Sequence, residues 1–437
     1  MASRFALIVW CLTGLAGVCG GETRALQAAE VALVPAPVSL QADPGRFAFT
    51  ADTKVWAGGP AAAEARKLID ALTPGLGREL ELTETGSAQS AGIALQLDDA
   101  LHSELGSEGY QLEVSPQRIE LRAAEPAGLF YAIQTLRQLL PPEFFAAAQP
   151  IQGEARCLPC LRITDRPRFA WRGLLIDPAR HFLPKDDVLR FIDVMAQHKF
   201  NRLQMHLTDD QGWRIEIKKY PRLTEIGAWR DETLVGHYGD QPWQFDGRRH
   251  GGFYTQDDIR ELVRYAAERY VTIVPEIEMP GHARAAIASY PELGVFPDKQ
   301  QEIRPWTRWG ISEDIFAPRP RTIEFCKEVL SEVMALFPSR YIHIGGDEAV
   351  KTQWKASAEI QQLIRAQGLQ NEAELQAWFT KQIDAFLTAN GRRLVGWDEI
   401  LEGGLPPGAV VMSWRGEKGG IAAAQSGHDV GWRPNRG

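Results

Sequence analysis

The chain has 437 residues, of which 44% are apolar and 24% charged, a composition typical of a globular protein with room for two or three domains. Its net charge of −8, without a basic cluster, argues against a nucleic-acid partner, and no internal apolar run is long enough for a membrane span. The expected partner is a small or neutral molecule, and the 13 Trp residues could line a sugar site or fill a core.

The N-terminus has the pattern of an export signal. Arg4 precedes an apolar run over residues 5–18, and small residues follow it. We expect a signal peptide at residues 1–28 and a periplasmic or extracellular mature protein. Cys19 could accept a lipid, but the preceding Ala16, Gly17 and Val18 fit a lipidation box poorly, so lipoprotein anchoring is disfavoured.

Three further cysteines bear on the fold. Export permits disulfides, and Cys157 and Cys160 could close a short loop. A lone Cys-x-x-Cys is only a weak zinc signal. Cys326 falls in a helical pattern and is expected to be a buried apolar residue.

Residues 29–160 are predicted to form a small α+β accessory domain. The predicted elements are a helix at 61–72, strands at 93–97, 110–114 and 119–123, and a helix at 128–140. No cluster of acids or histidines occurs in this stretch, which indicates a supporting role. Small residues and prolines at 149–159 mark its end.

Residues 161–437 are predicted to form a catalytic domain in which strands alternate with helices. Strands are predicted at 171–177, 202–207, 271–277, 341–345, 393–397 and 410–414, with helices at 185–199, 257–269, 322–337 and 372–389. Helices between successive apolar strands imply a parallel sheet, and no glycine-rich phosphate loop follows the first strand. We therefore expect an α/β fold of the (β/α)8 TIM-barrel type.

The most informative stretch is residues 340–349. Alternating apolar residues lead into Gly345 and Gly346 and then into two adjacent acids, Asp347 and Glu348. This pattern predicts a buried strand that delivers carboxyls at its C-terminal end, where parallel α/β proteins keep their chemistry. The alternative is that the acids cap the following helix, since the helix dipole favours acids at its N-terminus. The residues alone leave both interpretations open.

Polar residues also gather after the other predicted strands. In a barrel these strand ends converge on one mouth, so residues far apart in sequence share a pocket. Any one of them could be a structural charge, and their joint occurrence is the signal. They are Asp177, Arg180, His181, His206, Asp209, Asp210, Glu276, Glu278, His282, Trp397, Asp398, Glu399, Trp414 and Arg415.

Four motifs resemble those of family 20 of the glycoside hydrolases, the β-N-acetylhexosaminidases. They are His-Ile-Gly-Gly-Asp-Glu at 343–348, Gly-Leu-Leu-Ile-Asp-Pro-Ala-Arg-His at 173–181, Pro-Glu-Ile-Glu-Met-Pro-Gly-His at 275–282 and Gly-Trp-Asp-Glu at 396–399. The first domain resembles the family's accessory domain through Glu-Gly-Tyr at 108–110 and the helix that begins at Gly128. The resemblance therefore covers both domains.

The resemblance implies an exo-acting enzyme that removes terminal non-reducing N-acetylglucosamine or N-acetylgalactosamine residues by substrate-assisted, retaining catalysis. Adjacent carboxyls cannot easily straddle a sugar ring as acid and nucleophile, so the substrate's 2-acetamido group would attack C1. Glu348 would be the general acid and base. Asp347 would hold the acetamido N–H and stabilise the developing positive charge. No cofactor or metal is implied.

The resemblance also assigns the residues that would enclose the sugar. Arg180 would fork onto two adjacent outer hydroxyls, as its planar guanidinium allows. Trp397 and Trp414 would surround the methyl of the acetamido group and exclude water from the intermediate.

A further set would support Glu348. His282, with Asp209 or Asp210, resembles the family's residues that orient the catalytic acid. His206 and His343 could equally have a packing role.

The C-terminal end departs from the family pattern. The resemblance implies a seventh and an eighth strand, whereas residues 431–437 carry no strand pattern and the chain stops. We therefore expect a barrel that lacks its last strands, with exposed sheet edges and low solubility or activity.

Two other functions stay open. A metal-dependent hydrolase on the same barrel could use His206, Asp209, His282, His343 and Asp347, although no His-x-His or His-Glu-x-x-His spacing is present. Sensitivity to a chelator separates that function from a metal-free glycosidase. A truncated, inactive glycan-binding relative would show sugar affinity without turnover.

Overall fold

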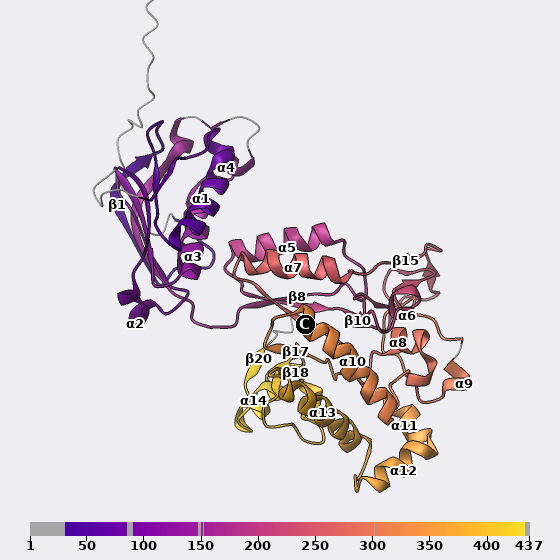
Figure 1. Ribbon diagram of the computed structural model, residues 1–437. Coiled ribbons are helices and arrows are strands. Elements are labelled where there is room, and N and C mark those ends of the chain that lie inside the picture. Colours follow the sequence, from indigo (N-terminus) through magenta and orange to yellow (C-terminus); the bar gives the residue numbers. More distant parts are fainter. Residues whose placement is uncertain (1–30, 85–90, 147–149, 152, 301, 433–437) are drawn as a thin grey trace, which may run out of the picture. The chain divides into compact units, whose positions relative to one another are not determined.

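The computed structural model describes residues 31–84, 91–146, 150–151, 153–300 and 302–432. The expected signal peptide at 1–28, with Cys19, lies outside these residues. The chain forms two compact units, one running to Ala170 and including Gln197–Lys199, the other comprising Trp171–Ala196 and the chain from Phe200 onward (Figure 1). None of the described helices is long and apolar enough to cross a bilayer.

The first unit is an α+β module built on one sheet. Its strand order is β1-β7-β5-β6-β4-β2-β3. The strands are β1 (Ser39–Ala48), β2 (Val55–Trp56), β3 (Leu82–Thr83), β4 (Gly92–Leu97), β5 (Tyr110–Val114), β6 (Arg118–Ala123) and β7 (Cys157–Asp165). Helices α1 (Ala61–Leu76) and α3 (Pro126–Leu139) pack on each other and against β4 and β6, and α2 (His102–Leu105) and α4 (Glu143–Ala146) are short. The predicted helices and strands of this unit are confirmed.

The disulfide that Cys157 and Cys160 could have formed is not present. Both residues lie on the extended strand β7, and Cys160 is a free, buried thiol, while Cys157 is disulfide-bonded elsewhere. Three residues along a strand span about 10 Å, which exceeds the ~7 Å between Cα atoms that a disulfide tolerates. Strand β7 pairs with β1 and β5, so the predicted domain boundary at 160/161 falls inside it. Cys326 is free and buried, as predicted.

The second unit is a curled parallel sheet with helices on its outer side. Its strand order is β20-β19-β18-β17-β16-β9-β8. The strands are β8 (Gly173–Ile176), β9 (Arg202–His206), β16 (Thr272–Glu276), β17 (Tyr341–His343), β18 (Arg393–Trp397), β19 (Val410–Ser413) and β20 (Val430–Trp432). The helices that alternate with them are α5 (Lys185–Gln197), α7 (Gln256–Ala267), α10 (Pro320–Leu336), α13 (Glu372–Ala389) and α14 (Glu417–Gln425) (Figure 1). The predicted TIM-barrel type of fold is confirmed.

The core of this unit lies between the sheet and its helices. Leu203 and Met205 of β9, Ile273 of β16 and Leu394 of β18 are buried in one cluster with apolar faces of α5, α7, α10 and α13. Because parallel strands are covered on both faces, they read as almost continuous apolar runs. That is why their positions could be predicted closely.

The C-terminal end differs from the prediction. Val430–Trp432 form β20, which pairs in parallel with β19 through Val411 and Val430, although the sequence there shows no strand pattern. A three-residue edge strand is set by its backbone pairing with β19, not by a side-chain pattern. Within the described residues, β8 and β20 each pair with one neighbour only, so the sheet is curled but not closed.

Two long loops follow the C-terminal ends of β9 and β16. They contain the antiparallel pairs β10 (Thr208–Asp209) with β11 (Gly212–Trp213), β12 (Trp229–Arg230) with β15 (His250–Gly251), and β13 (Leu234–Val235) with β14 (Gln244–Phe245). The short helices α6 (Arg222–Glu225), α8 (Arg284–Ser289) and α9 (Pro297–Gln300) also lie in these loops, while α11 (Thr352–Ala356) and α12 (Ala358–Ala366) follow β17.

Candidate active site

Asp347 and Glu348 lie just beyond β17 in a segment with unusual backbone geometry. Gly345, Gly346 and Glu348 have positive φ values of 66°, 88° and 45°. A Cβ on Gly345 would lie 1.6 Å from Oε2 of Glu278, so any other residue there would displace the Glu278 carboxyl. Helix α11 begins at Thr352 after Lys351, and neither acid caps it. The helix-cap interpretation is therefore wrong, and the strained segment instead presents two carboxyls at the strand end.

His282 connects this acid pair to the loop after β9. Its Nε2 lies 3.4 Å from Oε2 of Glu348 and 3.7 Å from Oδ2 of Asp347. Its Nδ1 lies 3.0 Å from Oδ1 of Asp209 and 3.2 Å from Oδ2 of Asp210. Burial disfavours a charge on His282, but Asp209, Asp210 and Glu348 together outweigh burial and hold the imidazole pKa well above its usual value. A protonated His282 thus joins the two aspartates to Glu348.

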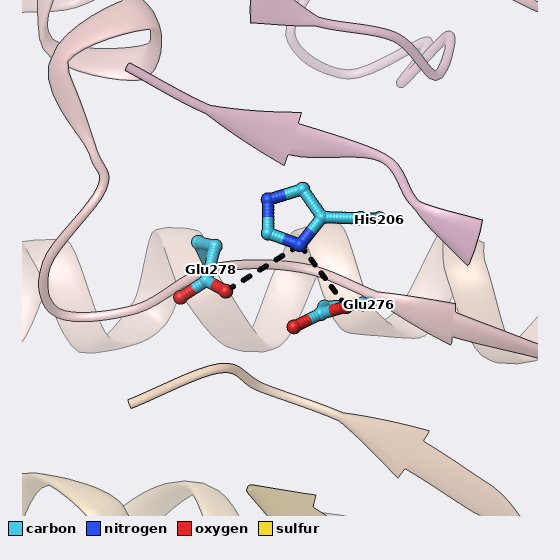
Figure 2. A group of neighbouring side chains, drawn as sticks. All are labelled: His206, Glu276 and Glu278. Atoms are coloured by element: carbon cyan, nitrogen blue, oxygen red, sulfur yellow. Dashed lines mark ion pairs between the residues drawn. The ribbon is translucent and has the colours of Figure 1, made fainter. Parts of the chain in front are cut away.

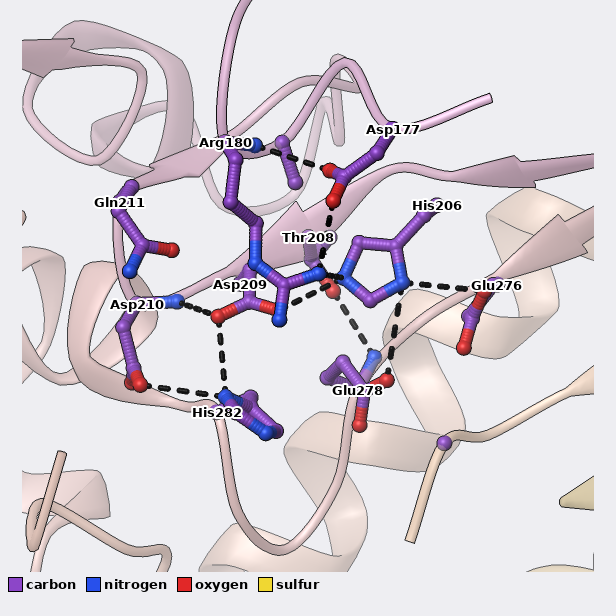
Figure 3. Close-up of polar contacts among 12 residues, drawn as sticks. Asp177, Arg180, His206, Thr208, Asp209, Asp210, Gln211, Glu276, Glu278 and His282 are labelled. Atoms are coloured by element: carbon purple, nitrogen blue, oxygen red, sulfur yellow. Dashed lines mark hydrogen bonds and ion pairs between the residues drawn. The ribbon is translucent and has the colours of Figure 1, made fainter. Parts of the chain in front are cut away.

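Arg180 lies on the other side of Asp209. Its Nη1 is 2.8 Å from Oδ2 of Asp177 and its Nη2 is 2.8 Å from Oδ2 of Asp209. Nη1 also approaches Nε2 of His206 at 3.1 Å. Asp209 therefore receives both Arg180 and His282, and the pKa of its carboxyl is well below the usual value because these cations outweigh its burial (Figure 3).

Glu276 is the centre of a second, deeper group. It is in register with His206 of β9 and with His343 of β17, so neighbouring strands bring three polar side chains to one level. Nδ1 of His206 lies 3.1 Å from Oε2 of Glu276 (Figure 2). Nδ1 of His343 lies 3.2 Å from Oε1 of Glu276. Gln204 donates to Oε2 at 2.7 Å and the Trp397 indole donates to Oε1 at 2.8 Å.

The charges in this deeper group are set by burial and pairing. Burial disfavours the ionised Glu276, but the two imidazoles beside it and the hydrogen bonds from His206 and Gln204 together outweigh burial and lower the pKa of this carboxyl. Burial also disfavours the charged His206, yet Glu276, Asp177 and Asp209 together outweigh burial and raise the pKa of His206 to about 10. The pKa of His343 falls to about 4 because burial dominates there. At neutral pH the group holds an ionised Glu276 beside a protonated His206.

Two buried carboxyls near the acid pair are poorly satisfied. Both oxygens of Glu278 and Oδ1 of Asp347 are buried without a hydrogen-bond partner. Burial, reinforced by the charge of Asp347, raises the pKa of Glu278 well above its usual value. Burial raises the pKa of Asp347 to about 6. Unsatisfied buried carboxyls are costly and mark functional sites more often than supporting ones.

The two tryptophans predicted to enclose the sugar occupy adjacent strands. Trp397 ends β18, is almost fully buried and packs edge-on against His343 with ring centroids 4.8 Å apart. Trp414, just after β19, is half-buried, belongs to the same apolar cluster and donates from its indole to Glu399 at 3.0 Å. Burial raises the pKa of Glu399 to about 7.

The predicted site residues thus come together as contiguous groups. Contacts link Asp347, Glu348, His282, Asp209, Asp210, Arg180 and His206, while Trp397 joins through Glu276. Trp414 has no direct polar contact with these residues among the interactions within the described chain. Sequence reasoning missed Gln204, whose signal was a lone amide inside an apolar strand, and Thr208, whose hydroxyl accepts from the Glu278 N–H at 2.9 Å.

Three groups could in principle hold a metal ion. They are His206 with Glu276 and Glu278, His282 with Asp209 and Asp210, and His282 with Asp347 and Glu348. Both imidazoles have raised pKa values and face carboxylates, and the guanidinium of Arg180 adjoins Asp209 and His206. A guanidinium in contact with two of the candidate ligands repels a cation, so the donor sets around Asp209 and His206 fit ion pairs better than a metal centre.

Family models match both units of the chain. The family model "Glycosyl hydrolase family 20, catalytic domain" matches residues 169–435, and "Glycosyl hydrolase family 20, domain 2" matches residues 30–166. A beta-hexosaminidase of Porphyromonas gingivalis is 41% identical over 99% of the chain and 54% of its own length. A beta-hexosaminidase of Vibrio furnissii is 37% identical over 95% of the chain and 65% of its own length. The chain thus spans between about half and two thirds of these relatives.

Solved structures give the same result. A β-N-acetylhexosaminidase from Bacteroides fragilis superposes with a TM-score of 0.75 at 32% identity, covering 91% of this chain and 74% of that one. A family 20 exo β-N-acetylglucosaminidase from Vibrio harveyi, in complex with N-acetylglucosamine, gives 0.79 at 34% identity, covering 94% and 61%. Since both family models match in chain order and the identities extend over nearly the whole chain, this chain belongs to family 20 of the glycoside hydrolases.

Proposed function

We propose that the protein is an exo-acting β-N-acetylhexosaminidase that removes terminal non-reducing N-acetylhexosamine residues from oligosaccharides. The observation that carries the proposal is the acid pair Asp347–Glu348, held beyond β17 on a strained backbone and contacted by a protonated His282. The names of the relatives from P. gingivalis and V. furnissii support the same activity.

The geometry favours a nucleophile supplied by the substrate. Asp347 and Glu348 are adjacent on one strand end and both face His282, so they cannot lie on opposite faces of a sugar ring as the carboxyl pair of an ordinary retaining glycosidase does. In the proposed reaction the acetamido oxygen attacks C1, and Glu348 gives its proton to the departing glycosidic oxygen. Ionised Asp347 accepts the acetamido N–H and stabilises the oxazolinium cation.

The second half of the reaction reverses these roles. A water molecule gives a proton to Glu348 and attacks C1, which opens the oxazolinium ring and restores the acetamido group with the original anomeric configuration. Nε2 of His282, 3.4 Å from Oε2 of Glu348, holds this carboxyl in place through both half-reactions.

The remaining predicted residues take positions suited to binding the sugar. Arg180 is anchored by Asp177 and Asp209 and has further N–H groups for the outer hydroxyls. Trp397 and Trp414 supply apolar walls beside the acid pair for the acetamido methyl group. The signal pattern at 1–28 further supports action outside the cytoplasm, with glycans as substrates.

Product analysis tests the proposal. Oligomers of β-linked N-acetylglucosamine are incubated with the purified protein, and we expect release of the monosaccharide with oligomers shortened by one residue at a time, unaffected by a chelator. Internal fragments would contradict exo action, and loss of activity with chelator would favour a metal-dependent hydrolase. Binding of the sugar without turnover would identify an inactive, glycan-binding relative.

A further inference from the structure

The backbone around Arg180 is held by two buried arginines. Three consecutive carbonyl oxygens accept from their guanidinium groups. Arg214 donates to Pro178 at 2.9 Å and to Ala179 at 2.8 Å, and Arg230 donates to the carbonyl of Arg180 at 2.7 Å. The segment that carries Arg180 is therefore fixed through its main chain, independently of the ion pairs made by the Arg180 side chain.

A histidine also holds the main chain of this segment, at Phe182. Nε2 of His250 accepts the N–H of Phe182 at 3.0 Å, and the His250 ring stacks on His181 with centroids 4.1 Å apart. His250 and Arg230 are directly opposite each other in the ribbon formed by β12 and β15. One ribbon in the long loop after β9 thus holds the residues on both sides of His181.

Arg214 ties this ribbon to the Arg180 segment. Its Nη1 donates to the carbonyls of Ala228 and Gly252, at 2.6 Å and 3.2 Å, which flank β12 and β15. A Cβ on Gly212 would lie 2.2 Å from Cζ of Arg214, so the glycine makes room for the guanidinium. The arginine therefore bridges the ribbon and the carbonyls that precede Arg180.

This arrangement carries an electrostatic cost. Arg214 and Arg230 are buried, with 0% and 2% of their surface exposed, and within the described residues neither forms an ion pair with a carboxylate. Burial, with the neighbouring Arg230 second, lowers the pKa of Arg214 to about 9. Burying two such cations is costly, because each loses its hydration and the nearby carboxylates, Asp177 for Arg214 and Asp246 for Arg230, offset that loss only in part. Their carbonyl contacts converge on the segment that presents Arg180.

We propose that Arg230 and His250, the facing pair of the β12–β15 ribbon, are positioning residues that fix the main chain of residues 180–182 and so aim the guanidinium of Arg180 at the outer hydroxyls of the terminal sugar. This inference rests on the proposed function. Asp177 and Asp209 hold the far end of the Arg180 side chain, while the ribbon holds its main chain. A two-pronged contact with adjacent hydroxyls needs both ends fixed, because its geometry tolerates little rotation.

A double-mutant cycle between Arg230 and Arg180 tests the proposal. Steady-state kinetics on a chromogenic N-acetylglucosaminide are measured for the parent, Arg230→Lys, Arg180→Ala and the double variant. We expect Arg230→Lys to raise KM about 10-fold with kcat nearly unchanged, since sugar binding is weakened more than chemistry. In the Arg180→Ala background the same substitution should have almost no further effect.

Two variants keep the test specific. Arg249→Ala is the matched control, and we expect it to leave KM unchanged. Arg249 is an exposed arginine next to His250, and its guanidinium lies over the ring of Trp229. His250→Gln retains an acceptor for the Phe182 N–H and should restore most of the affinity that His250→Phe loses.

The outcomes separate two kinds of failure. Equal effects of Arg230→Lys with and without Arg180, or a fall in kcat with KM unchanged, would overturn the positioning role and leave the proposed function intact. A parent protein that does not cleave the glycoside at all would instead overturn the proposed function.

Discussion

Two neighbouring groups of buried charge in the second unit differ in how well they are satisfied. Glu276 accepts from Gln204 and Trp397 and lies beside two imidazoles, on regular strands. Asp347 has a buried oxygen without a hydrogen-bond partner, and Glu348 has a left-handed backbone, as does His282. The first group has the properties of a support, and the second those of a reactive site.

The difference corresponds to where each group lies relative to the ends of the strands. The group around Glu276, whose carboxylate is satisfied although Nε2 of His343 is buried without a partner, lies inside the sheet, where strand register places His206 and His343 on either side of Glu276. The unsatisfied group lies just past the strand ends, where the chain leaves regular structure and strain can be stored. We therefore expect substitutions in the first group to change stability and those in the second to change activity.

The largest expected effect is on activity, from Glu348→Gln. This substitution removes the proton donor, so kcat/KM on glycosides with poor leaving groups should fall by roughly 10²–10⁴-fold. Activated aryl glycosides need less protonation and should lose less. The thermal midpoint should stay close to that of the parent, because the Glu348 side chain is 30% exposed. Glu313→Gln, at an exposed position, is the control.

A large loss of stability is expected from Glu276→Gln. The amide cannot accept from all its donors and removes the negative charge that faces Nδ1 of the protonated His206, which keeps only its Nε2 contact with Asp209, so the free energy of unfolding should fall by about 3–5 kcal/mol. Urea unfolding of the whole chain measures this loss. A stable Glu276→Gln protein with impaired turnover would reverse the roles assigned to the two groups.

Asp347→Asn is expected to increase the free energy of unfolding, in contrast to Glu276→Gln. The pKa of Asp347 rises from 3.8 to about 6 on folding, so the folded state binds the proton more tightly than the unfolded state. Parent stability therefore falls as pH rises from about 4 to 6, by roughly 2–3 kcal/mol. The asparagine variant lacks this loss and should be more stable than the parent at pH 7–8, though inactive. Unfolding curves at pH 4 and pH 8 give the difference in the free energy of unfolding between variant and parent at each pH. The same difference at both pH values would contradict this prediction.

The smallest expected effect comes from Thr208→Val. The Thr208 hydroxyl accepts the Glu278 N–H in a buried site, and valine of the same shape leaves that donor unpaired. We expect a loss of about 1–2 kcal/mol in the free energy of unfolding. Thr388→Val, at an exposed position of α13, should lie within about 0.5 kcal/mol of the parent.

Most of the second unit could be predicted because its strands are apolar runs and its helices are amphipathic. The strand-end residues could be assigned to one site because parallel strands end at one mouth. The partners of Glu276 could not be predicted, since they depend on which strands are neighbours and in what register. Strand β20 and the free thiol of Cys160 were mispredicted for related reasons: pairing and strand geometry decided both.

The central claim is that the substrate's own amide attacks C1 while Asp347 and Glu348 steer and protonate. The most direct measurement compares kcat/KM for two glycosides with the same leaving group, one with a 2-acetamido and one with a 2-hydroxyl group. We predict a preference of roughly 10³-fold or more for the acetamido substrate, because an internal nucleophile held near C1 has a high effective molarity. Equal rates on the two substrates would contradict the account.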